Sequence, residues 1–470
     1  MAEAEITARS DGVGFRSERG PILISLMLSV GLVAIDSTVI ATAVPSVVEN
    51  LGGLAQFPWL FSVYLLAQAV TVPMYGKLAD VFGRKPVMLF GIGGFLLGSI
   101  LCGLAWSMPA LIAFRAIQGI GGGAIQPMSL TIAGDIYSLE ERGKVQGYMA
   151  SVWAISAVVG PTLGGLFSQY LSWRWIFFVN VPLCLVAAIV LLRNFKENVV
   201  RRSHRLDYAG ATLLFVGCTL VLLGLLEGGE AWPWLSVAGL GVPLAGLVVL
   251  IFFVYSQRRA AEPVLPLWIF RHRTLVTCSM VSLCVGAVLL GLTSYVPLFV
   301  QGVLGTGPLV AGFALATLTL GWPLTASQSG KVYMRIGFRA TALIGSSLAI
   351  AGSLLASLLS TGSAVWQVGV ICFIVGAGMG LTASPTLILA QATVEWQDRG
   401  VVTGNNMFSR SVGSAVGVAV FGAIANATLR SNMDSAAIAR SSHHVFIAVA
   451  VVSVLMGLAV AAIPRSANPS

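Results

Sequence analysis

The chain has 470 residues, of which 57% are hydrophobic and only 10% are charged, and its mean hydropathy is +0.89. Soluble domains average about 25% charged residues. This composition therefore excludes an ordinary soluble enzyme, a disordered chain and a nucleic-acid-binding protein. The net charge of +9 arises from Lys and Arg scattered over short loops, as membrane topology requires, and it does not indicate a nucleic-acid partner.

Residues 1–20 are polar and form an expected N-terminal tail. The apolar segment that follows is too long for the core of a signal peptide, and the small residues at 41–43 lie beyond Asp36, so we expect this segment to remain as a span. Apolar segments bounded by charge, Gly or Pro then continue to the end of the chain. They fall at 21–48, 57–78, 86–106, 109–134, 143–170, 174–193, 208–226, 234–256, 274–300, 308–330, 339–360, 366–391, 401–428 and 443–463.

Each segment is about as long as the roughly 20 residues that a helix needs to cross a bilayer. In hydrocarbon every backbone polar group must be satisfied within the segment, and the runs lack the alternation of barrel strands, so all of them are predicted to be helices. The sequence thus predicts an all-α integral membrane protein with fourteen transmembrane helices. Twelve spans remain an alternative if two of the segments do not cross.

The distribution of basic residues orients these helices. With the N-terminus inside, 22 of the 27 Lys and Arg residues lie on the cytoplasmic side, Arg174, Arg430 and Arg440 lie outside, and Arg115 and Arg410 lie within spans. Cytoplasmic loops carry the excess of Lys and Arg. Both termini are therefore predicted to be cytoplasmic, in a multi-pass protein of the cell inner (plasma) membrane.

The chain repeats itself. GKLADVFGRK at 76–85 has a counterpart, GKVYMRIGFR, at 330–339, which is 254 residues further on. The glycines at 119, 121 and 123 recur at 376, 378 and 380, an offset of 257 residues. Both copies start on the same side of the membrane, so the repeat is parallel. We divide the chain into a tail (1–20), a six-helix bundle (21–200), a linker with two extra helices (201–264) and a second six-helix bundle (265–470).

These motifs resemble those of the major facilitator superfamily, and in particular of fourteen-span drug:proton antiporters. GKLADVFGRK resembles the signature between helices two and three, and RAIQGIG at 115–121 resembles the fourth-helix motif. GPTLGG at 160–165 resembles the fifth-helix antiporter motif, with Gly160, Pro161, Gly164 and Gly165, and IDSTV at 35–39 resembles the first-helix motif. The resemblance implies the major facilitator fold, with two parallel six-helix bundles plus two inserted helices, and a protein that works as a monomer.

Ionisable residues within spans mark function by default, and Asp36, Arg115 and Arg410 are those placed clearly within hydrocarbon. Asp36 and Arg115 lie at depths that differ by roughly 7 Å at 1.5 Å per residue, which a long Arg side chain spans. We expect Asp36 to bind and release the coupling proton and Arg115 to tune it. A fixed ion pair that only holds helices together is the alternative.

The charged residues beside the first loop motif are predicted to form a gate. By the family resemblance they latch the cytoplasmic end when the carrier opens outward, and losing them shifts the balance between states. Positive-inside topology accounts for the basic residues but not for the acid and glycines. The predicted gating residues are Gly76, Asp80, Gly83, Arg84, Lys85, Asp135, Glu141 and Arg142. The glycines of the fifth-helix motif serve either close packing or a functional role, as a hinge or as a seal against proton leak.

Polar and aromatic residues inside the helices are candidates for a weakly polar cavity that suits amphipathic, often cationic molecules. They are Tyr64, Gln68, Gln126, Trp153, Tyr295, Gln301, Trp322, Asn405 and Asn406. Arg410 has no acid at matching depth, so it either bonds to backbone carbonyls or holds an anionic group of a substrate or lipid.

No cofactor, metal ion or enzyme activity is expected. The six cysteines lie in apolar runs, the four histidines lack ligand spacing, and the chain has neither a phosphate-binding loop nor a catalytic elbow. The partners expected are protons, membrane lipid and a small amphipathic substrate, exported by antiport. Two alternatives remain: a proton-coupled exporter of one metabolite, lipid or siderophore, and a membrane receptor or scaffold that keeps the fold without transport.

Overall fold

A computed structural model describes residues 13–52, 59–197, 207–228, 232–260, 263, 267–429 and 435–464. Within these ranges the chain is helical. The helices are α1 (Gly20–Leu51), α2 (Trp59–Phe82), α3 (Arg84–Gly103), α4 (Met108–Ile136), α5 (Leu139–Tyr170), α6 (Trp175–Phe178), α7 (Asn180–Asn194), α8 (Tyr208–Glu227), α9 (Val237–Gln257), η2 (Leu267–Arg271), α10 (Arg273–Gly302), α11 (Pro308–Ile336), α12 (Phe338–Ser357), α13 (Val365–Ala392), η3 (Trp396–Asp398), α14 (Arg399–Leu429) and α15 (Ser435–Ala461).

Eleven candidate spans in the described part are long and apolar enough to cross a membrane. They lie in α1 to α4, in α6 and α7 together as Trp175–Asn194, in α9 to α13 and in α15. The three other predicted segments coincide with α5, α8 and α14. For these three helices a membrane crossing stays a prediction.

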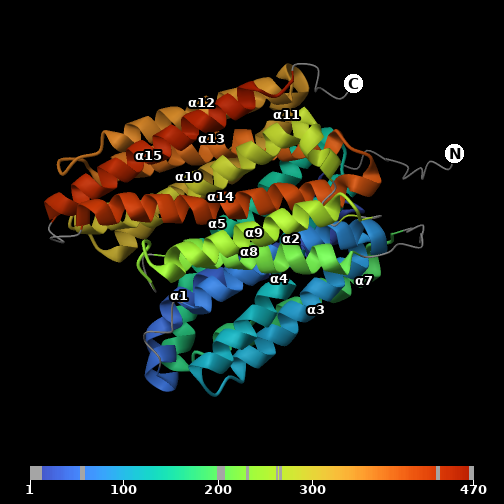
Figure 1. The fold of residues 1–470 in the computed structure, drawn as a ribbon, viewed down its shortest axis with the longest axis horizontal. Coiled ribbons are helices and arrows are strands. Elements are labelled where there is room, and N and C mark those ends of the chain that lie inside the picture. Colours follow the sequence, from blue (N-terminus) through green and yellow to red (C-terminus); the bar gives the residue numbers. More distant parts are fainter. Residues whose placement is uncertain are drawn as a thin grey trace.

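Equivalent helices pack in the same way in the two parts of the chain. In the first part α3 packs on α4, α1 on α5 and α2 on α4; in the second, α12 packs on α13, α10 on α14 and α11 on α13. In Figure 1 the first part lies below and the second above. We call them the first and second halves. The same pairs of helices thus build both halves, as the sequence repeat leads one to expect.

Glycines set how closely these helices approach. A Cβ on Gly119 would lie 2.5 Å from the carbonyl oxygen of Tyr64 on α2, and a Cβ on Gly121 would lie 2.2 Å from the amide nitrogen of Phe95 on α3. In the second half a Cβ on Gly376 would likewise lie 2.1 Å from the carbonyl oxygen of Leu318 on α11. The repeated glycines are therefore the points at which α4 and α13 meet their neighbours backbone to backbone.

Helices α8 and α9 form a hairpin that belongs to neither half. They pack on each other, and α8 also packs on α2 and α14, so the hairpin lies against the seam between the halves (Figure 1). Asp207 caps α8 by accepting from the amide of Gly210 at 2.8 Å, and it also accepts from Nε2 of Gln257 at 2.6 Å. This bond ties the first turn of α8 to the last residue of α9.

The last helix differs from its predicted limits. The apolar run predicts a span at 443–463, but α15 begins at Ser435 and includes Arg440, which the sequence places on the outer side of the membrane. Ser441 and Ser442 are fully buried, so the polar stretch before the apolar run continues the helix against the second half instead of forming a loop. A hydropathy criterion alone does not detect such a stretch.

Candidate functional site

Asp36 of α1 and Arg115 of α4 form a buried ion pair. The Arg115 Nη1 donates to Asp36 Oδ2 at 2.6 Å, and each residue is 1% exposed. The guanidinium also donates through Nε to the carbonyl oxygen of Leu60 at 3.2 Å and lies over the ring of Tyr64, 4.1 Å from its centroid. The structure thus brings together the two residues that the sequence singles out, and it places Tyr64 against this pair.

Three polar residues surround the Asp36–Arg115 pair: Gln118, Ser99 and Asn180. Gln118 accepts from Arg115 at 2.7 Å and donates to Asp36 Oδ1 at 2.8 Å and to Ser99 at 2.8 Å. Asn180, the first residue of α7, reaches the same carboxylate oxygen at 3.4 Å. The sequence alone does not single out these three residues as members of the site, although Gln118 lies one helical turn after Arg115 and therefore shares its face of α4.

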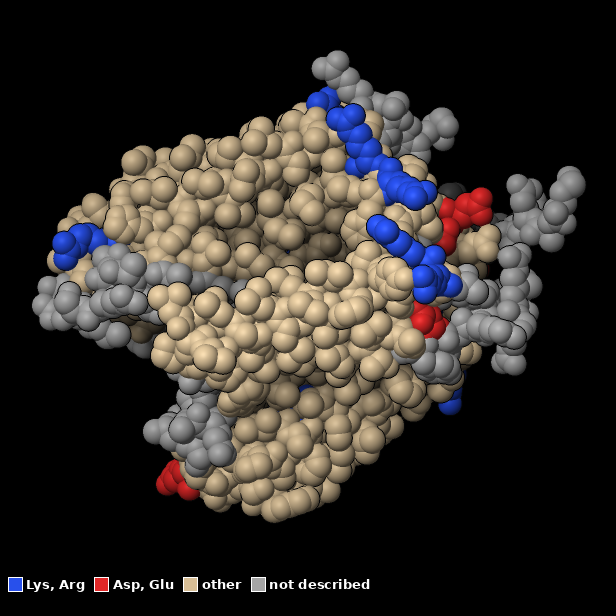
Figure 2. Space-filling view, in the orientation of Figure 1, with Lys and Arg blue, Asp and Glu red and all other residues tan. Residues whose placement is uncertain are grey.

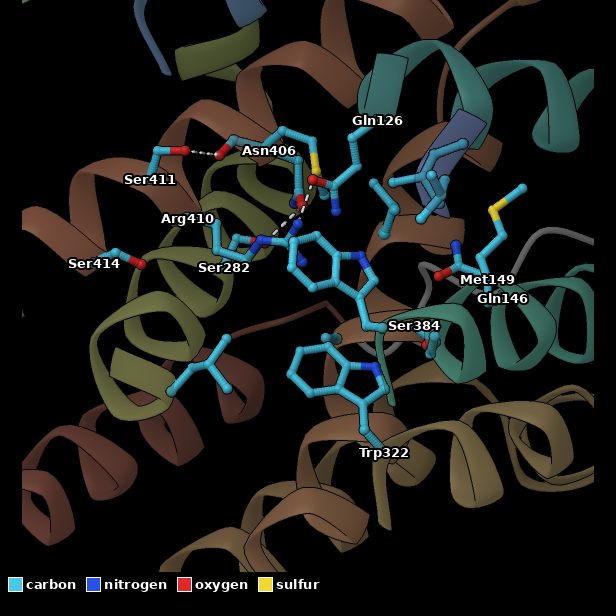
Figure 3. A pocket seen from close by; sticks show the side chains of 18 of the residues that line it. Gln126, Gln146, Met149, Ser282, Trp322, Ser384, Asn406, Arg410, Ser411 and Ser414 are labelled. Atoms are coloured by element: carbon cyan, nitrogen blue, oxygen red, sulfur yellow. Dashed lines mark hydrogen bonds between the residues drawn. The ribbon is translucent and has the colours of Figure 1, made fainter. Parts of the chain in front are cut away.

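A cavity of about 310 Å³ lies between the two halves, and it holds Arg410. Its walls come from α1, α4 and α5 on one side and from α10, α11, α13 and α14 on the other. Figure 3 shows Arg410 and Trp322 extending into the same space. Of the predicted cavity residues, five line it: Gln126, Trp153, Trp322, Asn406 and Arg410.

The other five predicted cavity residues do not line this cavity. Tyr64 packs under Arg115, and Asn405 donates to Ser279 at 2.8 Å within the second half. Tyr295 is half-buried against the core of the second half, and Gln301 is exposed near the end of α10. Gln68 lies on α2, where its backbone carbonyl accepts a hydrogen bond from the Thr71 hydroxyl. A polar residue in an apolar helix points equally well to an interhelical contact, and the sequence alone does not separate the two.

The predicted gating residues gather at one end of the molecule. Asp80 accepts from the amides of Gly400 and Val401 at 3.0 and 2.7 Å, at the N-terminus of α14 in the other half. Arg84 pairs with Asp80 at 2.9 Å and donates to the carbonyl oxygen of Trp396 at 2.5 Å. Its guanidinium also lies over the Trp396 ring, 3.9 Å from the ring centroid. A carboxylate is stabilised at a helix N-terminus by the free amides and the helix dipole.

Asp135 continues this network across the halves. It binds Arg84 and Arg399, both at 3.1 Å, and Arg399 also donates to the carbonyl oxygen of Gly134. We call the end that holds Arg19, Arg84, Arg142 and Arg399 the basic end. Figure 2 shows Lys and Arg concentrated toward this end of the visible face.

The remaining charged residues of the predicted gate bind within the first half. Glu141 pairs with Arg19 at 2.8 Å, and Arg142 donates to the carbonyl oxygens of Tyr137 and Gly134. Partial burial opposes ionisation of Glu141, but hydrogen bonds from Arg19 and Ser138 outweigh it and hold the pKa of the carboxyl below its ordinary value. Lys85 donates to the carbonyls that end α7.

Close glycine contacts join the halves at the basic end. A Cβ on Gly76 would lie 2.6 Å from the carbonyl oxygen of Gly400, and a Cβ on Gly143 would lie 2.4 Å from the amide nitrogen of Gly330. The two contacts occupy equivalent places in the repeat, because Gly330 lies 254 residues after Gly76 and Gly400 lies 257 residues after Gly143. Gly83 serves differently, because its φ of +97° makes the turn between α2 and α3.

The antiporter motif lies in α5 beside α1. A Cβ on Gly160 would lie 2.0 Å from Oγ1 of Thr38, and Gly164 is buried. Pro161 and Gly165 belong to α5, but their surroundings lie outside the described residues. The structure therefore shows a close α1–α5 contact at Gly160, while a hinge stays a prediction.

The chain is similar in sequence to a large protein family and to individual efflux proteins. Residues 26–418 match the Major Facilitator Superfamily. The chain is 34% identical over 415 residues to Multidrug resistance protein 3 of Bacillus subtilis (strain 168), which covers 88% of this chain and 81% of that protein. It is 31% identical over 404 residues to Efflux pump dotC of Dothistroma septosporum (strain NZE10 / CBS 128990), covering 84% of this chain and 70% of that protein.

A solved structure shares the fold. The crystal structure of the human organic anion transporter MFSD10 (TETRAN) superposes with a TM-score of 0.69 at 15% identity, covering 94% of this chain and 99% of that chain. At this identity the likeness concerns the fold alone. The chain belongs to the major facilitator superfamily and is a multi-pass membrane transporter.

Proposed function

We propose that this chain is a proton-coupled transporter that exports amphipathic organic compounds by alternating access, in exchange for protons. Its relatives are named as multidrug and efflux proteins, which supports export of organic compounds. We further propose that all fourteen predicted segments span the cell membrane, that both termini are cytoplasmic, and that the monomer is the working unit. The basic end is then the cytoplasmic end.

The observation that carries proton coupling is the buried Asp36–Arg115 pair. In the present conformation the Asp36 carboxylate is paired with Arg115 and accepts hydrogen bonds from Gln118 and Asn180. It does not line the cavity. A conformational change that separates α1 from α4 removes the counter-charge, and a proton then neutralises the carboxylate in its place. Return to the present packing restores the pair and expels the proton, so proton binding and release follow the conformational cycle.

Inverted membrane vesicles energised to a proton gradient test this role. Adding transported compounds is expected to dissipate the gradient for the wild type but not for Asp36→Asn, which keeps the shape and loses the charge. Glu49→Gln is the matched control, because Glu49 is an exposed carboxylate on the same helix. If Asp36→Asn dissipates the gradient as the wild type does, proton coupling does not run through Asp36.

A narrower function is the second candidate: export of one metabolite, lipid or siderophore, still coupled to protons. The cation in the cavity, Arg410, favours it, because a fixed charge selects among substrates. The same vesicles separate the two functions. Several unrelated compounds dissipate the gradient if the transporter is a multidrug exporter, and a single chemical type does so if it is selective.

A further inference from the structure

Arg410 places a positive charge in the wall of the central cavity. It lies on α14, with Asn406 one turn before it and Ser414 one turn after it, and all three line the cavity. Figure 3 shows its side chain directed inward from α14. The residue at the equivalent position of the first half, 257 positions earlier, is Trp153, which lines the cavity as well. The cavity is thus cationic on the α14 side and aromatic on the α5 side.

In the part of the chain that the structure describes, no carboxylate balances this charge within the cavity. None of the lining residues is acidic, and none of the ion pairs found among the described residues includes Arg410. The hydrogen bond that its guanidinium makes goes to the sulfur of Met407 at 3.1 Å, and a thioether is a weak acceptor. The buried acid of the first half, Asp36, is already bound to Arg115, Gln118 and Asn180.

If α14 spans the membrane, as we propose, an arginine on it that has no counter-charge among the described residues is costly, and such a residue persists where it serves a function. A neutral side chain at position 410 would complete the same helix without that cost. Guanidinium groups match carboxylate, sulfonate and phosphate groups with two parallel hydrogen bonds. The remaining walls are apolar and aromatic, with Trp153, Trp322, Leu289 and Leu387 among them. Such a cavity complements a molecule with an apolar body and one anionic group.

We propose that the substrates of this transporter are amphipathic organic anions, whose acidic group binds Arg410 while the apolar body lies against Trp153 and Trp322. The proposal rests on the proposed export function and deepens it by naming the substrate class. It replaces the cationic character expected from the sequence, since a cation entering this cavity meets a like charge and no carboxylate. A volume of about 310 Å³ accommodates a ring system of drug-like size.

Two dyes with the same xanthene ring system test the charge preference: fluorescein, which is anionic, and rhodamine 123, which is cationic. Binding to the purified protein in detergent is measured by fluorescence polarisation, and uptake is measured in energised inverted vesicles. The wild type is expected to bind and accumulate fluorescein. Loss of a charge-assisted bond in Arg410→Gln is expected to weaken fluorescein binding about tenfold or more.

Two variants control for effects that do not arise from Arg410 as an anion ligand. Arg410→Lys keeps the charge but not the paired donors, so it is expected to retain part of the affinity. Arg335→Gln removes one positive charge from an exposed position on α11 outside the cavity, and it is expected to bind fluorescein as the wild type does. A fall in affinity with Arg410→Gln but not with Arg335→Gln assigns the effect to the cavity.

The outcomes separate this proposal from the proposed function. If the wild type binds rhodamine 123 but not fluorescein, or if Arg410→Gln leaves fluorescein binding unchanged, the anion proposal is overturned even where export is observed. If fluorescein binds in an Arg410-dependent way but neither dye dissipates the proton gradient, the anion site stands and proton-coupled export fails. An increase in proton leak alone, with unchanged dye binding, also overturns the anion site.

Discussion

Gln118 satisfies two buried charges at once. Its carbonyl accepts from Arg115 and its amide donates to Asp36, so a neutral side chain closes the triangle between acid and base. Asn180 approaches the same carboxylate oxygen, but at 3.4 Å against 2.8 Å for Gln118. Because hydrogen bonds weaken with length, the two amides should contribute unequally to the stability of the first half.

Gln118→Leu is therefore expected to destabilise the protein by about 1–3 kcal/mol, the range for leaving a buried polar partner unsatisfied, and here the partners are charged. Asn180→Leu is expected to cost less. Thermal unfolding of the detergent-solubilised protein checks both, with the change in midpoint compared between the two variants. Equal or reversed effects would show that the 2.8 Å bond is not the stronger one.

The sequence reveals the charges of this site but not their neighbours. Asp36 and Arg115 are predictable because charge in an apolar helix is rare and conspicuous. Ser99 and Asn180 are not predictable, because small polar residues are common in helices, and their meeting depends on how α3 and α7 pack. The repeat gives one more clue: the positions equivalent to Arg115 and Gln118 are Cys372 and Val375, both buried in the core of the second half. The pair thus belongs to one half only.

At the basic end the two halves meet where α2 crosses the N-terminus of α14, and we call this meeting of the halves the closure. Asp80 lies at the N-terminus of α14, and Gly400 in the first turn of α14 lies against Gly76 on α2. A Cβ at position 400 would come within 2.6 Å of the Gly76 carbonyl and 2.5 Å of the Asp80 carboxylate. Since backbone cannot yield at such a contact, any side chain there must push α2 and α14 apart.

Gly400→Ala is expected to open the basic end and populate the opposite conformation. Spin labels at Lys144→Cys and Lys331→Cys, both exposed and next to the Gly143–Gly330 contact, should then show a longer-distance population by double electron–electron resonance. The six native cysteines are buried, which favours labelling of the introduced pair. Gly93→Ala is the control, because a Cβ on Gly93 meets open space. An unchanged distance distribution in Gly400→Ala would contradict the steric argument.

At the scale of whole helices, the sequence predicts which residues are equivalent in the two halves, but not which residues touch or where each helix begins. The repeat pairs Gly76 with Gly330 and Gly143 with Gly400, yet the contacts themselves run crosswise, Gly76 to Gly400 and Gly143 to Gly330. No periodicity indicates that crossing, since it follows from the rotation that relates the halves. The start of α15 at Ser435 is likewise set by tertiary packing of polar residues, which hydropathy does not register.

Across the whole molecule, the described hydrogen bonds between the halves gather at the basic end. Three side chains of the first half take part: Asp80 accepts from the amides of Gly400 and Val401, Arg84 donates to Trp396, and Asp135 accepts from Arg399. Two side chains of the second half donate in the other direction: Gln391 to the carbonyl oxygen of Leu130 and Tyr333 to that of Leu139. The cavity lies beyond this closure. Such an arrangement favours a cycle in which the closure opens and reforms, rather than a channel that stays open.

A cross-link across the closure should therefore stop transport without destroying the binding site. With Lys144→Cys and Lys331→Cys joined by a short bis-maleimide, the halves are held at the basic end, so vesicle uptake should fall to the level of the empty membrane. Dye binding by the purified protein should persist, since the cavity is not touched.

Arg339→Cys with Ala462→Cys is the matched control for this cross-link. Arg339 donates to the carbonyl oxygen of Ala461 within the second half, so joining these two sites leaves the halves free to move. The cross-link between positions 144 and 331 joins α5 to α11. If the protein that carries it still transported, the substrate path would not require the basic end to open. Alternating access through the basic end would then have to be abandoned.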